Sequence, residues 1–206
     1  MRSGLTGCGL LVIDLQRAFC LQDGSVARQG RDISACKAVI DKCRPLVAAA
    51  RKGNVPVIWT RMVFRPDYAD GGVLVHSLRP GMKHVGALRA GTRDAEFVPD
   101  MDVRDEDFVI EKARFSAFIG TCLELTLRQL AVQNLFVCGV TTSMCVESTV
   151  RDASQRDFNV HVIQDACAEL DQMRHEASIT AMAFGFAKIV DTKKATAMLS
   201  GRKTVD

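Results

Sequence analysis

A chain of 206 residues with a formal net charge of +3 is long enough for one α/β domain with a sizeable core, so a single domain over residues 1–206 is expected. Basic and acidic residues are scattered along the chain, and this argues against a nucleic-acid partner, which requires a basic patch. No stretch approaches the roughly 20 consecutive apolar residues of a membrane-spanning helix, and the first residues lack a secretory signal, so no membrane partner and a cytoplasmic location are expected.

Short apolar runs alternate along the chain with longer segments of helical periodicity. Six runs are predicted to be strands, at residues 10–14, 55–60, 108–111, 135–140, 160–165 and 188–191. The predicted helices cover residues 33–52, 121–133, 143–155, 172–184 and 194–199. Continuous apolar runs are typical of parallel strands buried on both faces, so this pattern predicts a doubly wound α/β fold.

Signals at the helix ends agree with the periodicity. Asp32 is expected to cap the first long helix, which should end at Gly53, ahead of Pro56. Thr121 and Glu124 have the spacing of a capping box at the start of the next helix.

The segment from residue 61 to residue 107 does not follow this alternation. It is far longer than an ordinary crossover connection and is rich in glycine and proline. Connections of that length are usually functional or disordered. A long loop at about 61–107 that contributes to substrate binding or to subunit contacts is therefore expected.

Three polar residues follow apolar runs, where open parallel sheets bind ligands beyond the carboxyl ends of their strands. Asp14 ends the first run, Lys112 follows the third, and Cys145 lies shortly after the fourth. A thiolate is a strong nucleophile, a carboxylate can take the thiol proton, and an ammonium group stabilises nearby anions. Each residue alone has a simpler structural interpretation, but the three together predict nucleophilic catalysis by Cys145.

The charge state of the Cys145 thiol stays open at this level. Lys112 and the first turn of a helix capped by Ser143 would favour the thiolate. Asp14 would oppose a second negative charge and favour a thiol that shares its proton with the carboxylate.

Three blocks of sequence carry a resemblance to a known family. The blocks are LLVIDLQRAF near the start, VIEKARFSAFIGTCLELTL in the middle, and FVCGVTTSMCVESTVRDA followed by VHVIQDACAE. Together they resemble the isochorismatase-like cysteine hydrolases, from about residue 10 to residue 191. The blocks fall in family order, with an Asp, a Lys and a Cys at the matching places.

The resemblance implies a Rossmann-like α/β/α sandwich with a six-stranded parallel sheet in the order 3-2-1-4-5-6. It also implies a catalytic triad of Asp14, Lys112 and Cys145. The Val140–Thr141 peptide bond is expected to be cis, and the backbone N–H groups of Thr141 and Cys145 are expected to form an oxyanion hole. The implied reaction cleaves a C–N bond of a small amide or ureide through a thioester and releases ammonia, in a homodimer or homotetramer.

Family members that act on nicotinamide carry a metal site built from an Asp-x-His pair after the second strand and a further histidine. This chain has Trp59-Thr60-Arg61-Met62 at that place, and His76 and His84 lack a paired carboxylate. We therefore expect no metal and no cofactor. The chain matches better the branch that acts on N-carbamoylsarcosine, ureidoacrylate or biuret.

Five residues are candidates for contact with the substrate. Arg61 and Arg65 are expected to bind a substrate carboxylate, because a guanidinium group pairs with both oxygens. Phe19, Phe64 and Phe115 are expected to form apolar walls of the pocket. Surface solubility and core packing are the alternative explanations for these residues.

Two other functions remain open. An isochorismatase-type hydrolase of a vinyl ether would act through Asp14 alone, and family members with that activity generally lack the cysteine. A non-catalytic binding or redox-sensing scaffold would use Cys145 only as an oxidisable thiol. Asp14 and Lys112 argue against the scaffold, which needs no proton shuttle.

Overall fold

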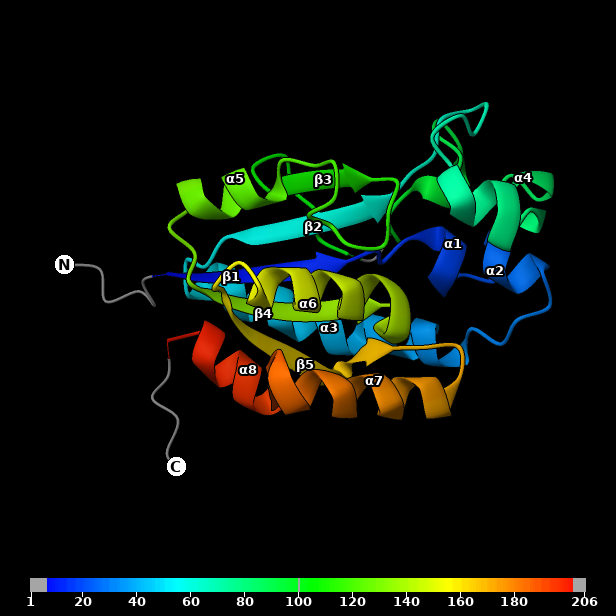
Figure 1. Cartoon of the computed structure of the whole chain (residues 1–206). Helices are drawn as coiled ribbons and strands as arrows, with labels where there is room; N and C mark the ends of the chain where they lie inside the picture. Colours follow the sequence, from blue (N-terminus) through cyan, green and yellow to red (C-terminus); the bar gives the residue numbers. More distant parts are fainter. Residues whose placement is uncertain (1–6, 100, 202–206) are drawn as a thin grey trace.

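The computed structural model describes residues 7–99 and 101–201 and contains a six-stranded parallel sheet. Its strands are β1 (Cys8–Ile13), β2 (Val57–Met62), β3 (Phe108–Lys112), β4 (Asn134–Val140), β5 (Asn159–Ala168) and β6 (Lys188–Val190). They lie in the order β3-β2-β1-β4-β5-β6 (Figure 1), so the predicted strand order is confirmed. The order reverses between β1 and β4, the place where such sheets bind ligands.

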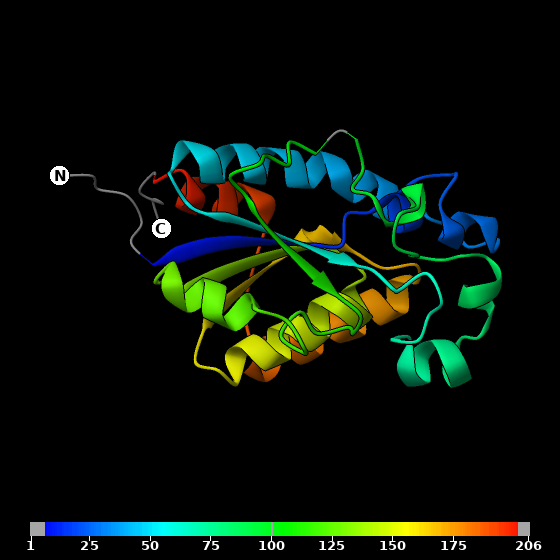
Figure 2. The same ribbon diagram turned by 90° about the horizontal axis from the view of Figure 1, so that it is seen from above.

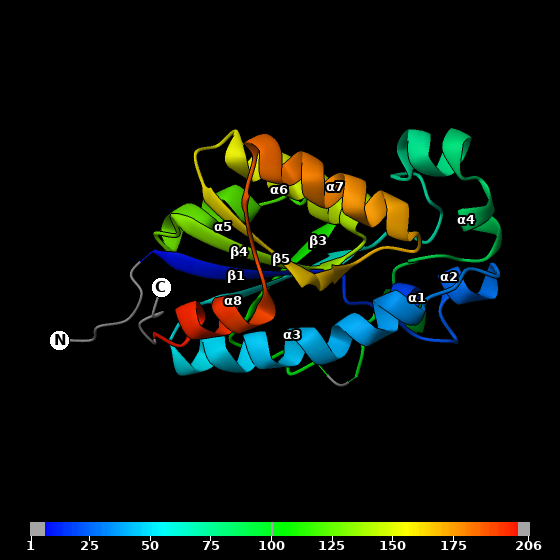
Figure 3. The same ribbon diagram turned by 90° about the horizontal axis from the view of Figure 1, so that it is seen from below.

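Helices cover both faces of the sheet (Figures 2 and 3). One face carries α3 (Ser34–Lys52) and α8 (Thr192–Leu199), and the other carries α5 (Leu123–Gln129), α6 (Glu147–Ser154) and α7 (Gln172–Gly185). Because side chains alternate along a strand, Leu10 packs into the core beneath α3 while Leu11 packs into the opposite core. The predicted three-layer arrangement is thus confirmed. Among the described residues, no helix has the length and apolar character needed to cross a membrane.

The helix ends follow the sequence signals in part. Asp32 accepts a hydrogen bond from the first backbone N–H of α3 (2.8 Å), and α3 ends at Gly53 as predicted. Thr121 accepts a hydrogen bond from the N–H two residues further on (3.1 Å). Glu124, however, pairs with Arg156 (3.0 Å) on the outside of the molecule. The predicted capping box is therefore only half formed.

Over residues 63–99 and 101–107, the connection between β2 and β3 has no long crossover helix, yet it is built from defined short elements. They are a π-helical turn at Leu74–Leu78, α4 (Gly81–His84) and a 3-10 turn at Arg93–Ala95. The connection buries Phe64 and Tyr68 beneath itself. Figure 1 shows α4 beside α1 (Arg17–Cys20) and α2 (Ser25–Arg28), beyond the arrowheads of the strands. The connection therefore contributes to the face where a ligand is expected.

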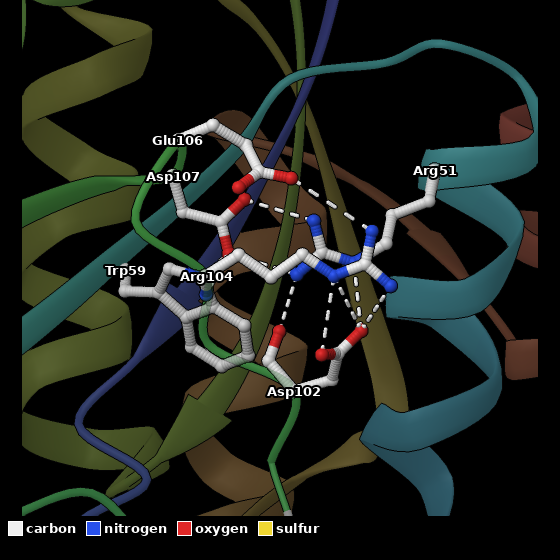
Figure 4. A network of polar contacts seen from close by, with 6 residues as sticks. All are labelled: Arg51, Trp59, Asp102, Arg104, Glu106 and Asp107. Carbon is white, nitrogen blue, oxygen red and sulfur yellow. Dashed lines mark hydrogen bonds and ion pairs between the residues drawn. The ribbon is translucent and has the colours of Figure 1, made fainter.

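A polar network anchors the last residues of this connection (Figure 4). Arg51 of α3 donates hydrogen bonds to both carboxylate oxygens of Asp107 (2.9 and 2.8 Å), and the Trp59 indole donates a third (2.9 Å). Burial raises the pKa of Asp107, but the hydrogen bonds from Arg51, from the Arg104 backbone and from Trp59 outweigh burial, so the pKa is lowered. The network ties the start of β3 to α3 and β2.

Candidate active site

Asp14 follows β1 directly and lies at the point where the strand order reverses. Its backbone has φ 50°, a left-handed conformation that is uncommon for a residue other than glycine. On one side, its N–H donates to the Thr60 carbonyl (3.1 Å) and the Thr60 hydroxyl donates to Oδ1 (2.5 Å). On the other side, Gly139 of β4 comes so close that a Cβ there would lie 2.0 Å from the Ile13 carbonyl oxygen. Both neighbouring strands thus fix the carboxylate.

Lys112 ends β3 and carries its ammonium group into the same buried space. Its Nζ lies 2.6 Å from Asp14 Oδ2, and neither side chain has exposed surface. The same Nζ donates to Cys145 Sγ (3.2 Å) and to the Arg114 carbonyl (3.2 Å). Burial lowers the pKa of Lys112, but the negative charges of Asp14 and of a Cys145 thiolate outweigh burial, so the pKa is raised. Lys112 therefore lies as a cation between the Asp14 carboxylate and the Cys145 sulfur.

Cys145 lies in a π-helical turn at Thr142–Val146 that joins β4 to α6, and not in the first turn of a regular helix. The Val140–Thr141 peptide bond before this turn is cis. Burial raises the pKa of the Cys145 thiol most, Asp14 raises it further, and Lys112 lowers it by less. Of the two charge states left open by the sequence, the structure favours the neutral thiol.

A cavity of about 370 Å³ opens over the thiol. Thr141 and Cys145 lie together in its wall, and Phe19 and Phe115 contribute aromatic surface as predicted. Asp14 and Lys112 pack behind Cys145 and are fully buried. The sulfur is therefore the member of the cluster that meets a molecule in the cavity.

Arg61, Arg65 and Phe64 lie outside this cavity. Arg61 faces Glu111 in the register of β2 and β3 and forms an ion pair with it. Arg65 pairs with Asp67 at the surface (3.2 Å). Phe64 is fully buried, with its ring centroid 5.9 Å from that of Tyr68. The prediction that these three residues contact the substrate is therefore not supported by their positions.

Three other arginines line the cavity: Arg31, Arg79 and Arg174. Arg174 lies 3.4 Å from Glu169 Oε1. Within residues 7–99 and 101–201, the side chains of Arg31 and Arg79 have no hydrogen-bond or ion-pair partner. The cavity wall thus carries positive charge from Arg31, Arg79 and Arg174, and not from Arg61 and Arg65.

The carboxylate of Glu169 was missed by the sequence reasoning. It lies at the end of β5, is buried, and accepts hydrogen bonds at Oε2 from the backbone N–H (3.0 Å) and the hydroxyl (2.6 Å) of Ser143. Because Ser143 lies two residues before Cys145, these hydrogen bonds hold the turn that presents the thiol. Thr60 was missed as well. Glu169 follows an apolar run, so the rule that selected Asp14 could have found it, whereas Thr60 lies within the run at 55–60.

A parallel α/β sheet with a buried Asp–Lys–Cys cluster at the carboxyl ends of its strands is the architecture of a cysteine hydrolase. The chain belongs to the isochorismatase family, because residues 8–194 match the family model described as Isochorismatase domain.

The comparisons with individual proteins agree with this assignment. The chain is 31% identical over 195 residues to the ureidoacrylate amidohydrolase RutB of Methylorubrum extorquens. This match covers 89% of this chain and 75% of that relative. A cysteine hydrolase from Pseudomonas syringae pv. phaseolicola superposes with a TM-score of 0.86 at 25% identity, over 94% of this chain and 92% of the other. A pyrazinamidase of Pyrococcus horikoshii in complex with zinc gives a TM-score of 0.75 at 25% identity, over 90% and 99%.

The zinc of that pyrazinamidase has no matching donor set here. In the part of the chain that the structure describes, no three His, Cys, Asp or Glu side chains come together in a way that could hold a metal ion. At the end of β2 and just after it, Met62 and Phe64 are buried apolar residues. His76 lies with Nε2 2.9 Å from the Tyr68 carbonyl oxygen. These residues do not fit a metal centre.

Proposed function

We propose that this protein hydrolyses a C–N bond of a small ureide or amide through a thioester on Cys145. The observation that carries the proposal is the buried chain of contacts from Asp14 to Lys112 (2.6 Å) and from Lys112 to Cys145 (3.2 Å), directly behind the cavity wall. The similarity to a ureidoacrylate amidohydrolase supports a ureide as the substrate class.

In the first half of the reaction, Asp14 takes the thiol proton as Cys145 Sγ attacks the carbonyl carbon. Oδ2 suits this role because, among the described residues, it has Lys112 as an ionic neighbour but no hydrogen-bond donor in good geometry. The proton then passes from Asp14 to the departing nitrogen, and ammonia leaves. Since the pKa of the thiol is raised, removal of the proton is coupled to the attack.

In the second half, water attacks the thioester and Asp14 takes a proton from the water. The Cys145–carbon bond breaks and the thiol regains a proton. Backbone N–H groups of Thr141 and Cys145 stabilise the oxyanion in both halves. Lys112 stays protonated throughout and acts through its charge on Asp14 and on the transient thiolate.

A substrate that carries a carboxylate fits the cavity better than a neutral one. Arg31 and Arg79 lie in the wall without partners among the described residues, and a guanidinium group binds two carboxylate oxygens at once. Glu169 and its partner Arg174, which also line the cavity, neutralise each other. We assign carboxylate binding to Arg31 and Arg79 in place of Arg61 and Arg65.

A cytoplasmic location and assembly as a homodimer or homotetramer belong to the same proposal. The structure contains eight free cysteines, which is typical of a reducing compartment.

The test is ammonia release from a panel of ureidoacrylate, N-carbamoyl amino acids, biuret, maleamate and nicotinamide, with isochorismate as a vinyl ether. Turnover of at least one ureide or amide is expected, and Cys145→Ala should lower it by about a thousandfold or more. Activity on the vinyl ether that survives Cys145→Ala would favour ether hydrolysis through Asp14. A panel on which the protein is inactive would overturn the proposal.

A further inference from the structure

A second cavity, of about 330 Å³, lies beside the catalytic one. The two share walls: α2 contributes Ser25 to the catalytic cavity and Arg28 to the second, and the loop after α4 contributes Leu88 to the first and Arg89 to the second. No step of the proposed reaction uses a residue of the second cavity. Its charged residues are four arginines and two aspartates: Arg17, Arg28, Arg89, Arg93, Asp23 and Asp94.

The two aspartates of this cavity already have hydrogen-bond and ion-pair partners in the protein. Asp23 lies 2.5 Å from Arg17, and the ion pair lowers the pKa of Asp23. Asp94 is buried, and its two oxygens accept the backbone N–H groups of Ser25 (2.7 Å) and Leu88 (2.7 Å). Asp94 also lies 3.8 Å from Arg28, so each aspartate offsets one arginine and two of the four arginine charges remain.

The arginines, in contrast, are only partly satisfied. Arg28 donates to the Val85 carbonyl (3.0 Å) and lies 3.8 Å from Asp94. Arg89 and Arg93 are exposed, and across residues 7–99 and 101–201 their side chains have no hydrogen-bond or ion-pair partner. The cavity therefore holds an excess of positive charge, and that excess is concentrated on Arg89 and Arg93.

We propose that this cavity is a second ligand site, which binds a small organic polyanion between Arg89, Arg93 and Arg28. Each guanidinium fork matches a phosphoryl or carboxylate group, and a concave wall of one sign concentrates the field on a counter-ion. The volume of about 330 Å³ is roughly ten times the share of one water in the liquid, so a phosphate ester or a tricarboxylate fits. A monovalent ion neutralises only one of the two free cations and is held weakly.

The test measures binding and not turnover, so its failure is distinguishable from failure of the proposed function. Isothermal titration calorimetry at fixed ionic strength would use pyrophosphate and citrate as probes, with chloride as the reference. We expect at least one of the probes to bind at a site that does not depend on Arg31 and Arg79 of the catalytic cavity, with no comparable heat from chloride. Citrate binding without pyrophosphate binding identifies a carboxylate ligand, and the reverse identifies a phosphate ligand.

Variants locate the site. Arg89→Gln/Arg93→Gln should weaken binding at least tenfold, and because both side chains are exposed and unpartnered among the described residues, Tm should stay unchanged. The matched control Lys37→Gln/Arg65→Gln removes the same charge from exposed positions outside both cavities and should bind like the parent. An equal loss of probe binding in the control variant would show that binding depends only on the net charge of the protein, and would overturn the proposal.

A further variant separates the two cavities. Arg79→Gln removes a guanidinium group from the catalytic cavity, and probe binding should survive it. Loss of binding in Arg79→Gln, with retention in Arg89→Gln/Arg93→Gln, would place the anion over Cys145 and overturn the second site.

Discussion

Two ion pairs in this molecule are built in opposite ways: the part-buried Arg51–Asp107 pair and the fully buried Lys112–Asp14 pair. The Asp107 carboxylate accepts four hydrogen bonds, two from Arg51 and one each from Trp59 and the Arg104 backbone, as Figure 4 shows in part. Asp14 accepts one at Oδ1 from Thr60, and its Oδ2 has no donor in good geometry among the described residues.

One chain thus uses an ion pair between a carboxylate and a cation both for stability and for reaction. A buried ion pair must offset the loss of hydration, and additional hydrogen bonds do this for Asp107. The Lys112–Asp14 pair has fewer such hydrogen bonds, and Oδ2 meets the Lys112 ammonium (2.6 Å), which also contacts the thiol at the cavity wall (3.2 Å). The saturated pair anchors an element, and the unsaturated pair can exchange a proton.

We expect the largest effect when the cation of the Lys112–Asp14 pair is removed. Lys112→Met should lower turnover by about a thousandfold, since the transient thiolate loses its counter-ion. It should also lower the free energy of unfolding by about 3 kcal/mol, because Asp14 is left as an unpaired buried charge. Adding Asp14→Asn should restore much of the stability but none of the activity. Steady-state kinetics and urea denaturation measure the two effects, and a stable, active Lys112→Met would refute the comparison.

The second prediction concerns the charge state of the Cys145 thiol. Because the pKa of Cys145 is raised, its alkylation by iodoacetamide should accelerate about tenfold per pH unit from neutral pH upward. At neutral pH the exposed Cys122 should be labelled before Cys145. Mass spectrometry of partially labelled protein follows both sites. A labelling rate at Cys145 that is flat between pH 7 and pH 9, which are roughly the useful limits of the assay, would indicate a resting thiolate instead.

The third prediction tests the saturated pair. Asp107→Asn should lower the free energy of unfolding by about 2–3 kcal/mol near neutral pH while turnover of the folded enzyme stays unchanged. Because the pKa of Asp107 is lowered on folding, its contribution is complete above the ordinary carboxyl pKa and is lost as the pH falls through the lowered value. The stability curves of variant and parent should therefore converge in acid. Fluorescence of Trp59, the single tryptophan, reports the transition directly.

The smallest expected effect is that of a chelator. The donor set of a metal centre does not fit the residues behind β2, so overnight treatment with EDTA should change turnover by less than about twofold. Loss of activity that added zinc restores would contradict this and make His76 and His84 the first ligands to mutate.

The fold was predictable because each strand is a continuous apolar run with clear turn signals around it. Asp14, Lys112 and Cys145 were predictable because each follows such a run and carries a side chain with a chemical use. The position of Arg61 outside the cavity was not predictable, since its partner Glu111 becomes visible only when the register of β2 and β3 is known. The charge state of the thiol depended on burial, which a sequence does not give.

Asp94 contacts both segments that separate the two cavities and can therefore couple ligand binding in one cavity to binding in the other. Its carboxylate clamps α2 at Ser25 and the loop at Leu88, and both segments form part of the partition between the cavities. A polyanion drawn toward Arg28 would compete with Asp94 for that side chain and strain the clamp. Linkage between two sites is reciprocal, so a substrate that tightens the partition would change the affinity for the polyanion by the same factor as the polyanion changes the affinity for substrate.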